Sequence, residues 1–127
     1  MKKLLSLLLS LALIITCLTF TACVPSNPEK AVKKLEKQGY TATLTESQAL
    51  LNAEAISLGL ELNSITAKVY AVNGGSIVTL YYCSNSDTAD KLEDILDNLN
   101  DYNENIEVEQ FGKKVAVGSE QGIEAID

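Results

Sequence analysis

The sequence of 127 residues contains no histidine and no arginine. Without histidine there is no imidazole base, no Ser-His or Cys-His nucleophile pair and no His-ligated zinc, so the commonest catalytic constellations are absent. Ten lysines stand against 17 acidic residues, a net charge of −7, which does not suit a surface that clamps phosphate or binds nucleic acid. A glycine-rich phosphate loop and a Cys-x-x-Cys pair are also missing. We therefore expect a protein that is not an enzyme and does not bind nucleic acid.

Long apolar runs are confined to the start of the chain. Met1-Lys2-Lys3 is a short basic segment, and a mostly apolar run extends from Leu4 to Leu18. This length fits the central region of a secretory signal, whereas a membrane-spanning helix needs about 20 residues. We predict a signal peptide over residues 1–22, with an uncleaved N-terminal anchor as the alternative.

The run is followed by Phe20-Thr21-Ala22-Cys23, which places small residues at the two positions before a cysteine. This pattern resembles the lipobox of bacterial lipoproteins, although that family usually has Leu or another aliphatic residue in place of Phe20. The resemblance implies cleavage between Ala22 and Cys23 and a diacylglyceryl group on the thiol of Cys23. Cys17 is a second candidate, with a poorer cleavage residue before it. We expect a protein that is lipid-anchored in the cell membrane and faces outside the cytoplasm.

The composition changes when the predicted signal is set aside. The remaining 105 residues hold 8 lysines and 17 acidic side chains, a side-chain charge of −9. Cys83 is then the one free thiol, so packing and not a disulfide within the domain must stabilise the fold. We expect a lipidated tether over residues 23–27 and a single folded domain over residues 28–127.

The elements of that domain follow from caps, turns and periodicity. Asn27 is placed to cap a helix that starts at Pro28 and stops at Gly39. We then expect a strand over 40–45 and a helix capped by Thr45, with Ala49, Leu50, Ala53 and Ile56 at helical spacing. A hairpin of strands 65–72 and 76–83 follows, around the turn Asn73-Gly74-Gly75.

The second half of the domain begins with a helix from Ser86 or Asp87 to near Tyr102, whose buried stripe is Ala89, Leu92, Ile95, Leu96 and Leu99. A second hairpin of strands 106–111 and 113–118 around Gly112 and a short helix capped by Ser119 complete the domain.

This order predicts an α+β fold. After the leading helix, strand-helix-strand-strand-helix-strand matches the split βαβ arrangement of ferredoxin-like folds, with an extra N-terminal helix and a fifth strand. We expect an antiparallel sheet with helices on one face. The strand residues expected to face those helices are Tyr40, Ala42, Leu44, Ile65, Ala67, Val69, Ala71, Val78, Leu80 and Tyr82.

The opposite face of the sheet is the candidate binding surface. It is expected to show Thr41, Thr43, Lys68, Tyr70, Thr79, Tyr81, Cys83, Glu107 and Glu109. Aromatic rings beside hydroxyl groups suit a protein or peptide partner, with Tyr70 and Tyr81 as anchors and Lys68 and Thr79 beside them. The alternative is that the leading or terminal helix covers this face and buries the tyrosines as ordinary packing.

Two helices carry charge patterns that favour further partners. Lys30, Lys33, Lys34 and Lys37 of the leading helix lie near the anchor and could contact anionic headgroups. Asp90, Asp94, Asp97 and Asp101 lie on one side of the second long helix and could dock a cationic partner. For both patterns, a solvated helix surface is the alternative.

One segment partly matches a calcium loop. Asp101, Asn103, Asn105 and Glu107 repeat its early ligand positions. However, Ile106 stands where the loop requires glycine, and the twelfth position is Gly112 instead of Glu. These residues are therefore weak metal candidates, and we expect no cofactor besides the lipid on Cys23.

Three functions are compatible with these observations. The first is a noncatalytic accessory lipoprotein that binds a protein or peptide at the membrane. The second is a carboxylate- or metal-dependent envelope hydrolase whose acids the fold brings together. The third is an immunity or exclusion lipoprotein whose charge of −9 captures a cationic toxin. In size and layout the chain also resembles the small uncharacterised lipoproteins of bacterial envelopes.

Overall fold

The computed structural model describes residues 24–101 and 103–127. Cys23 and the predicted signal peptide over residues 1–22, which includes Ala22, lie outside the described residues. The elements in chain order are α2 (Pro28–Glu36), β1 (Thr41–Thr45), α3 (Gln48–Ser57), β2 (Ile65–Asn73), β3 (Ser76–Cys83), α4 (Ser86–Asn100), β4 (Glu107–Phe111), β5 (Lys114–Gly118) and α5 (Glu120–Ile126). The predicted order of helices and strands is confirmed.

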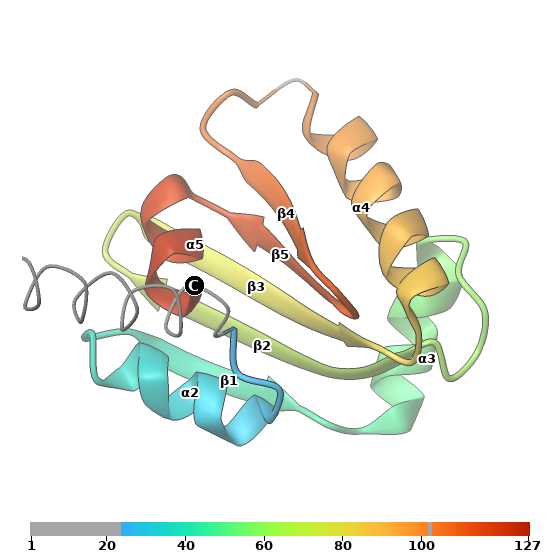
Figure 1. Ribbon diagram of the computed structural model, residues 1–127, viewed down its shortest axis with the longest axis horizontal. Helices are drawn as coiled ribbons and strands as arrows, with labels where there is room; N and C mark the ends of the chain where they lie inside the picture. Colours follow the sequence, from blue (N-terminus) through green and yellow to red (C-terminus); the bar gives the residue numbers. More distant parts are fainter. Residues whose placement is uncertain (1–23, 102) are drawn as a thin grey trace, which may run out of the picture.

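The five strands form one antiparallel sheet in the order β1-β2-β3-β5-β4 (Figure 1). Strands β2 and β3 make the predicted hairpin, in which Asn73 pairs with Ser76 and Gly74-Gly75 is the two-residue turn. Gly74 has a φ of 60°, a conformation that glycine adopts at little cost. The second hairpin turns at Gly112, which has a φ of 65°.

The split βαβ unit occurs in the second half of the domain. Strand β5 pairs antiparallel with both β3 and β4, so β3 and β4 run parallel on either side of it and α4 connects them. In the first half, β1 and β2 are antiparallel neighbours, and α3 connects two adjacent strands. The ferredoxin-like order of elements therefore contains one split unit.

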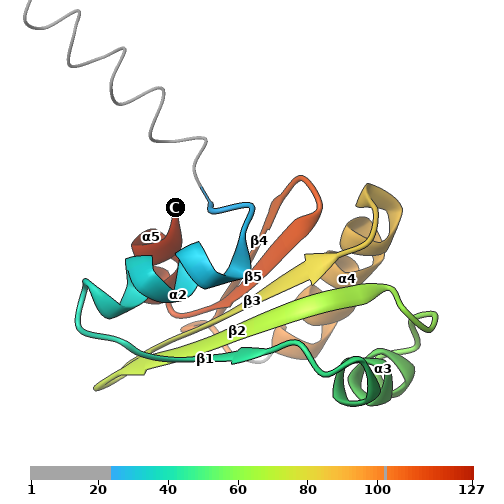
Figure 2. The same cartoon turned by 90° about the horizontal axis from the view of Figure 1, so that it is seen from below.

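Helices cover both faces of the sheet (Figure 2). Helices α3 and α4, which belong to the ferredoxin-like order, pack on one face as expected, over a core that includes Leu51, Leu92 and Val115. The leading helix α2 and the terminal helix α5 cover the other face, over a core that includes Leu35 and Ile126. The sheet is thus the middle layer of three.

The predicted assignment of the two faces to helices was wrong. The strand residues that were expected to face α3 and α4, such as Ala67, Val69 and Leu80, face α2 and α5 instead. The alternation separated the faces correctly, but it does not say which helix covers which face. Ile65 is an exception, because a register shift between Ile65 and Ala67 turns it toward α3 and α4.

Helix α3 also differs from its predicted form. Its N-cap is Ser47, because Thr45 stays in β1 opposite Lys68. The helix buries Leu51 and Ala55, whereas Leu50 and Ile56 are more than half exposed. In α4, Ala89, Leu92 and Leu96 are buried as predicted, but Leu99 is exposed. At the starts of α2 and α5, the side chains of Asn27 and Ser119 form their predicted caps.

The described part of the predicted tether is docked onto the domain. Val24 is 5% exposed and belongs to the core beneath α2 and α5. The hydroxyl of Tyr82 donates a hydrogen bond of 2.6 Å to the carbonyl oxygen of Pro25. The chain is therefore fixed to the domain from residue 24 onward.

Candidate functional site

The four residues predicted to form a binding surface do share one face of the sheet. Lys68 is the cross-strand partner of Tyr81, and Tyr70 is the partner of Thr79. Their face is the one on which α3 and α4 pack. Glu109 lies on the other face, since it pairs with Ala116, which belongs to the core beneath α2 and α5. Glu107, two residues earlier in β4, lies on the same side as Glu109. The structure therefore removes the two acids from the predicted surface.

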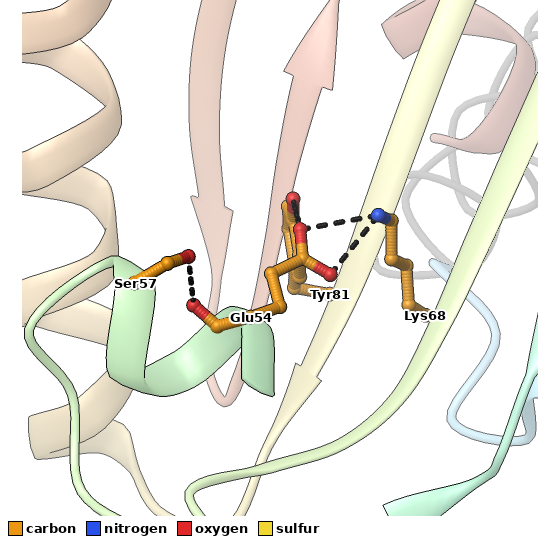
Figure 3. A network of polar contacts seen from close by, with 4 residues as sticks. All are labelled: Glu54, Ser57, Lys68 and Tyr81. Atoms are coloured by element: carbon orange, nitrogen blue, oxygen red, sulfur yellow. Dashed lines mark hydrogen bonds and ion pairs between the residues drawn. The ribbon is translucent and has the colours of Figure 1, made fainter. Parts of the chain in front are cut away.

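Helix α3 covers the Lys68–Tyr81 end of this face through one carboxylate (Figure 3). Glu54 accepts hydrogen bonds of 3.0 and 3.1 Å from the ammonium group of Lys68. It also accepts a hydrogen bond of 2.6 Å from the hydroxyl of Tyr81. The Lys68 nitrogen lies 5.6 Å from the centre of the Tyr81 ring, within the range of a cation–π contact.

This network makes Tyr81 a structural residue. Tyr81 is 6% exposed, and burial, followed by its hydrogen bond to Glu54 and that group's charge, holds the pKa of its phenol well above its usual range. The hydroxyl therefore remains a donor to Glu54. Tyr81 cannot be the exposed anchor that was predicted, and the helix that buries it is α3, not the leading or terminal helix.

Sequence reasoning missed Glu54, although a signal for it exists. Glu54 is the one acid in α3, and Lys68 is the one charged residue between Ile65 and Cys83. A lone charge on an amphipathic element is seldom buried without a partner of opposite sign. Pairing the two single charges would have placed α3 over β2.

The other end of the face remains partly open to solvent. We call it the open half-face and define it by six residues of β1, β2 and β3: Thr41, Thr43, Tyr70, Val72, Ile77 and Thr79. All six are uncharged and either exposed or half-buried, and Tyr70 is 41% exposed. Figure 2 shows α3 toward the opposite end of the sheet.

Cys83 lies at the covered end and is 7% exposed. Burial raises the pKa of its thiol to about 11, so the reactive thiolate is disfavoured. The residue packs in the core beneath α3 and α4.

The acidic row of α4 lies on the solvent side of its helix. Asp90, Asp94, Asp97 and Asp101 are all exposed, opposite the buried stripe. The pKa of Glu93 is raised by partial burial and by the charges of Asp97, Asp94 and Asp90. The helix therefore concentrates negative charge that a cationic partner would relieve.

Two of the four predicted calcium ligands line a common groove, and the other two do not. Asn105 and Glu107 line a surface groove of about 280 Å³ whose lining does not include Asp101 or Asn103. The Asn103 side chain instead accepts a hydrogen bond of 3.1 Å from the backbone N–H of Asn105. Among residues 24–101 and 103–127, no group of three His, Cys, Asp or Glu residues is arranged to hold a metal ion.

A second groove, of about 360 Å³, lies between the end of α3 and the start of α4. Its lining includes two carboxylates, Glu61 and Asp87, beside Lys91. If the chain were a carboxylate-dependent hydrolase, these are the acids that the groove offers.

The four lysines of α2 have different environments. Lys34 donates hydrogen bonds to the carbonyl oxygens of Ile126, at 3.1 Å, and Asp127, at 3.0 Å, and so binds the end of α5. Lys30, Lys33 and Lys37 are exposed. Three of the four predicted headgroup contacts thus remain at the surface.

Comparison with known proteins found no match among protein-family models, curated proteins or solved structures. In the part of the chain that the structure describes, no helix has the length and apolar character needed to cross a membrane.

Proposed function

We propose that this protein is a membrane-anchored extracytoplasmic lipoprotein whose domain binds a protein or peptide partner and performs no catalysis. The open half-face carries the proposal. It is an uncharged surface on a domain of side-chain charge −9, and it contains a tyrosine that is 41% exposed, whereas Tyr81 on the same face is 6% exposed.

The chemistry of the open half-face suits a protein surface. Charged residues are depleted at the centre of protein interfaces, and tyrosine is enriched there. Tyr70 offers an apolar ring together with a hydroxyl, and Val72 and Ile77 add half-buried apolar surface beside it. Thr43 and Thr79, the cross-strand neighbours of Tyr70, add hydroxyl groups that can bond to a partner's backbone.

Replacing Tyr70 tests the surface directly. Membranes containing the full-length protein would be crosslinked and solubilised, and the co-purified partner identified by mass spectrometry. We expect Tyr70→Ala to weaken binding of that partner by about 2 kcal/mol, roughly thirtyfold, as truncating an interface anchor does. Leu99→Ala is the matched control, because Leu99 is an exposed apolar residue on α4, outside the open half-face. Equal recovery with both variants would contradict the proposal.

The anchor is tested separately at Cys23. We expect Cys23→Ala to abolish incorporation of radiolabelled fatty acid and to leave the protein unprocessed or released from the membrane. Cys17→Ala is the control and should be processed normally. Membrane attachment and processing of the Cys23→Ala protein at the level of the unaltered chain would refute the anchor.

The acidic row of α4 favours one alternative, capture of a cationic toxin. Its binding would weaken steeply with salt, since the exposed aspartates are screened within about 10 Å at 0.1 M ionic strength. Asp94→Asn with Asp97→Asn should then abolish protection of cells against the toxin, whereas Tyr70→Ala should not. Loss of protection with Tyr70→Ala alone would return the function to the open half-face.

A further inference from the structure

We infer that the anchored protein lies with the face carrying α2 and α5 against the bilayer and with the open half-face turned away from it. The inference rests on the proposed lipid anchor at Cys23. It adds how the domain is held, and it identifies the headgroup surface of the bilayer as the partner of the α2–α5 face.

The chain joins the domain on the face that carries α2 and α5. Val24 is buried in the core on the α2–α5 side, and Pro25 is held by the hydroxyl of Tyr82. Tyr82 belongs to β3, the central strand of the five. The described chain therefore begins on this side of the sheet, beside α2 and α5 and not on the side of α3 and α4 (Figure 2).

The chain between the proposed anchor and the domain is very short. Cys23 is bonded directly to Val24, and one residue spans at most about 3.6 Å. A helix with its side chains is about 10 Å across, so a lipid on Cys23 cannot reach a bilayer that stands well clear of α2 and α5. A lipid inserted in the membrane brings the outer surfaces of these helices to the headgroups.

The charges on the two sides are compatible with this orientation. Lys33 lies midway between the buried residues Ala31 and Leu35 and so points outward from α2, where its ammonium group can meet a headgroup phosphate. Glu120 and Glu124 of α5 share this side, so we assign the orientation to the position of the anchor and expect it in neutral bilayers as well. The acidic row of α4 lies on the far side, away from anionic lipids.

Two fluorescent labels on opposite helices test the orientation. Lys33→Cys places a thiol on the outer side of α2. Ala53→Cys places one on the outer side of α3, midway between buried Leu51 and Ala55. Cys83 is buried, and its raised thiol pKa keeps it slow to react with the label. The lipidated full-length protein would be labelled and reconstituted into phosphatidylcholine vesicles containing lipids with a nitroxide on the headgroup.

We expect the nitroxide lipids to quench the label at position 33 strongly and the label at position 53 hardly at all. The matched control inserts ten Gly/Ser residues between Cys23 and Val24, which leaves the docked segment and the fold intact but frees the anchor. This insertion should remove the difference between the two labels. Equal quenching without the insertion, or a difference that survives it, would overturn the inference.

Mass spectrometry of the same samples separates this inference from the proposed function. Protein without a diacylglyceryl group on Cys23 would refute the anchor itself. Lipidated protein without differential quenching would refute the orientation alone.

Discussion

At the scale of single residues, two glycines bring α5 and the backbone of the sheet into close contact. Gly118 and Gly122 both lie against the backbone carbonyl of Ile77, where a Cβ atom at either position would overlap that group. Beside them, Ser119 accepts a hydrogen bond of 3.1 Å from the backbone N–H of Ile77, and its hydroxyl lies 3.1 Å from that of Ser76. The absence of side chains at the two glycines lets α5 approach this closely.

We predict that Gly122→Ala destabilises the protein, against the rule that alanine is the better helix residue. The added Cβ would force α5 away from β3, at a cost of about 1–3 kcal/mol, as overpacking a core does. The midpoint of urea unfolding measures the effect.

Gly75→Ala is the matched control for this substitution. Gly75 has nothing within 4 Å of its ideal Cβ position, so its replacement should change the midpoint little. A Gly122→Ala protein as stable as the original would show that α5 does not pack on Ile77 as described.

At the scale of elements, the sequence predicted the helices and strands well because their signals are local. The turn at Gly74-Gly75 and the cap at Asn27 depend on a few consecutive residues. Which helix covers which face is a nonlocal question that alternation does not answer. The register shift between Ile65 and Ala67 and the hydrogen bond from Tyr81 to Glu54 of α3 depend on how the elements pack together.

The sequence therefore predicts which residues share the face of the candidate site, but not which of them are exposed to solvent. The alternation of side chains along β2 and β3 places Tyr70 and Tyr81 on the same face of the sheet, so the sequence pattern gives the same prediction for both. The structure separates them because α3 contacts β2 near Lys68, leaving Tyr81 6% exposed and Tyr70 41% exposed.

The end of strand β3 makes stability sensitive to alkaline pH. Three consecutive residues, Tyr81, Tyr82 and Cys83, are buried, and burial raises the pKa of each. The pKa of Tyr82 rises from 10.0 to about 12 and that of Cys83 from 9.0 to about 11. The unfolded chain therefore loses these protons first, and the free energy of unfolding should fall as the pH rises above about 9.

Cys83→Ala tests the assignment of this dependence. It removes the group that titrates first in the unfolded chain, so the decline should begin about one pH unit later than in the unaltered protein. Urea unfolding between pH 7 and 11 follows the onset. Parallel curves for the two proteins between pH 9 and 10 would contradict the raised pKa of Cys83.

At the scale of the whole molecule, two cores share one sheet. Leu35 of α2 and Leu92 of α4 are fully buried on opposite faces of the same sheet. Strands β2, β3 and β5 contribute residues to both cores, so neither layer of helices can detach without exposing strands on which the other depends. The domain should therefore unfold as one cooperative unit.

We predict that Leu35→Ala and Leu92→Ala each lower the stability of both faces together, by about 2–5 kcal/mol, as truncating a buried leucine does. Hydrogen exchange resolved by peptide measures this, because it follows α2 and α4 in the same sample. Leu62→Ala is the control, since Leu62 is 59% exposed in the loop before β2 and its loss should leave both faces unchanged. Faster exchange confined to α2 in Leu35→Ala, with α4 protected as before, would show that the two layers unfold independently and that the sheet does not couple them.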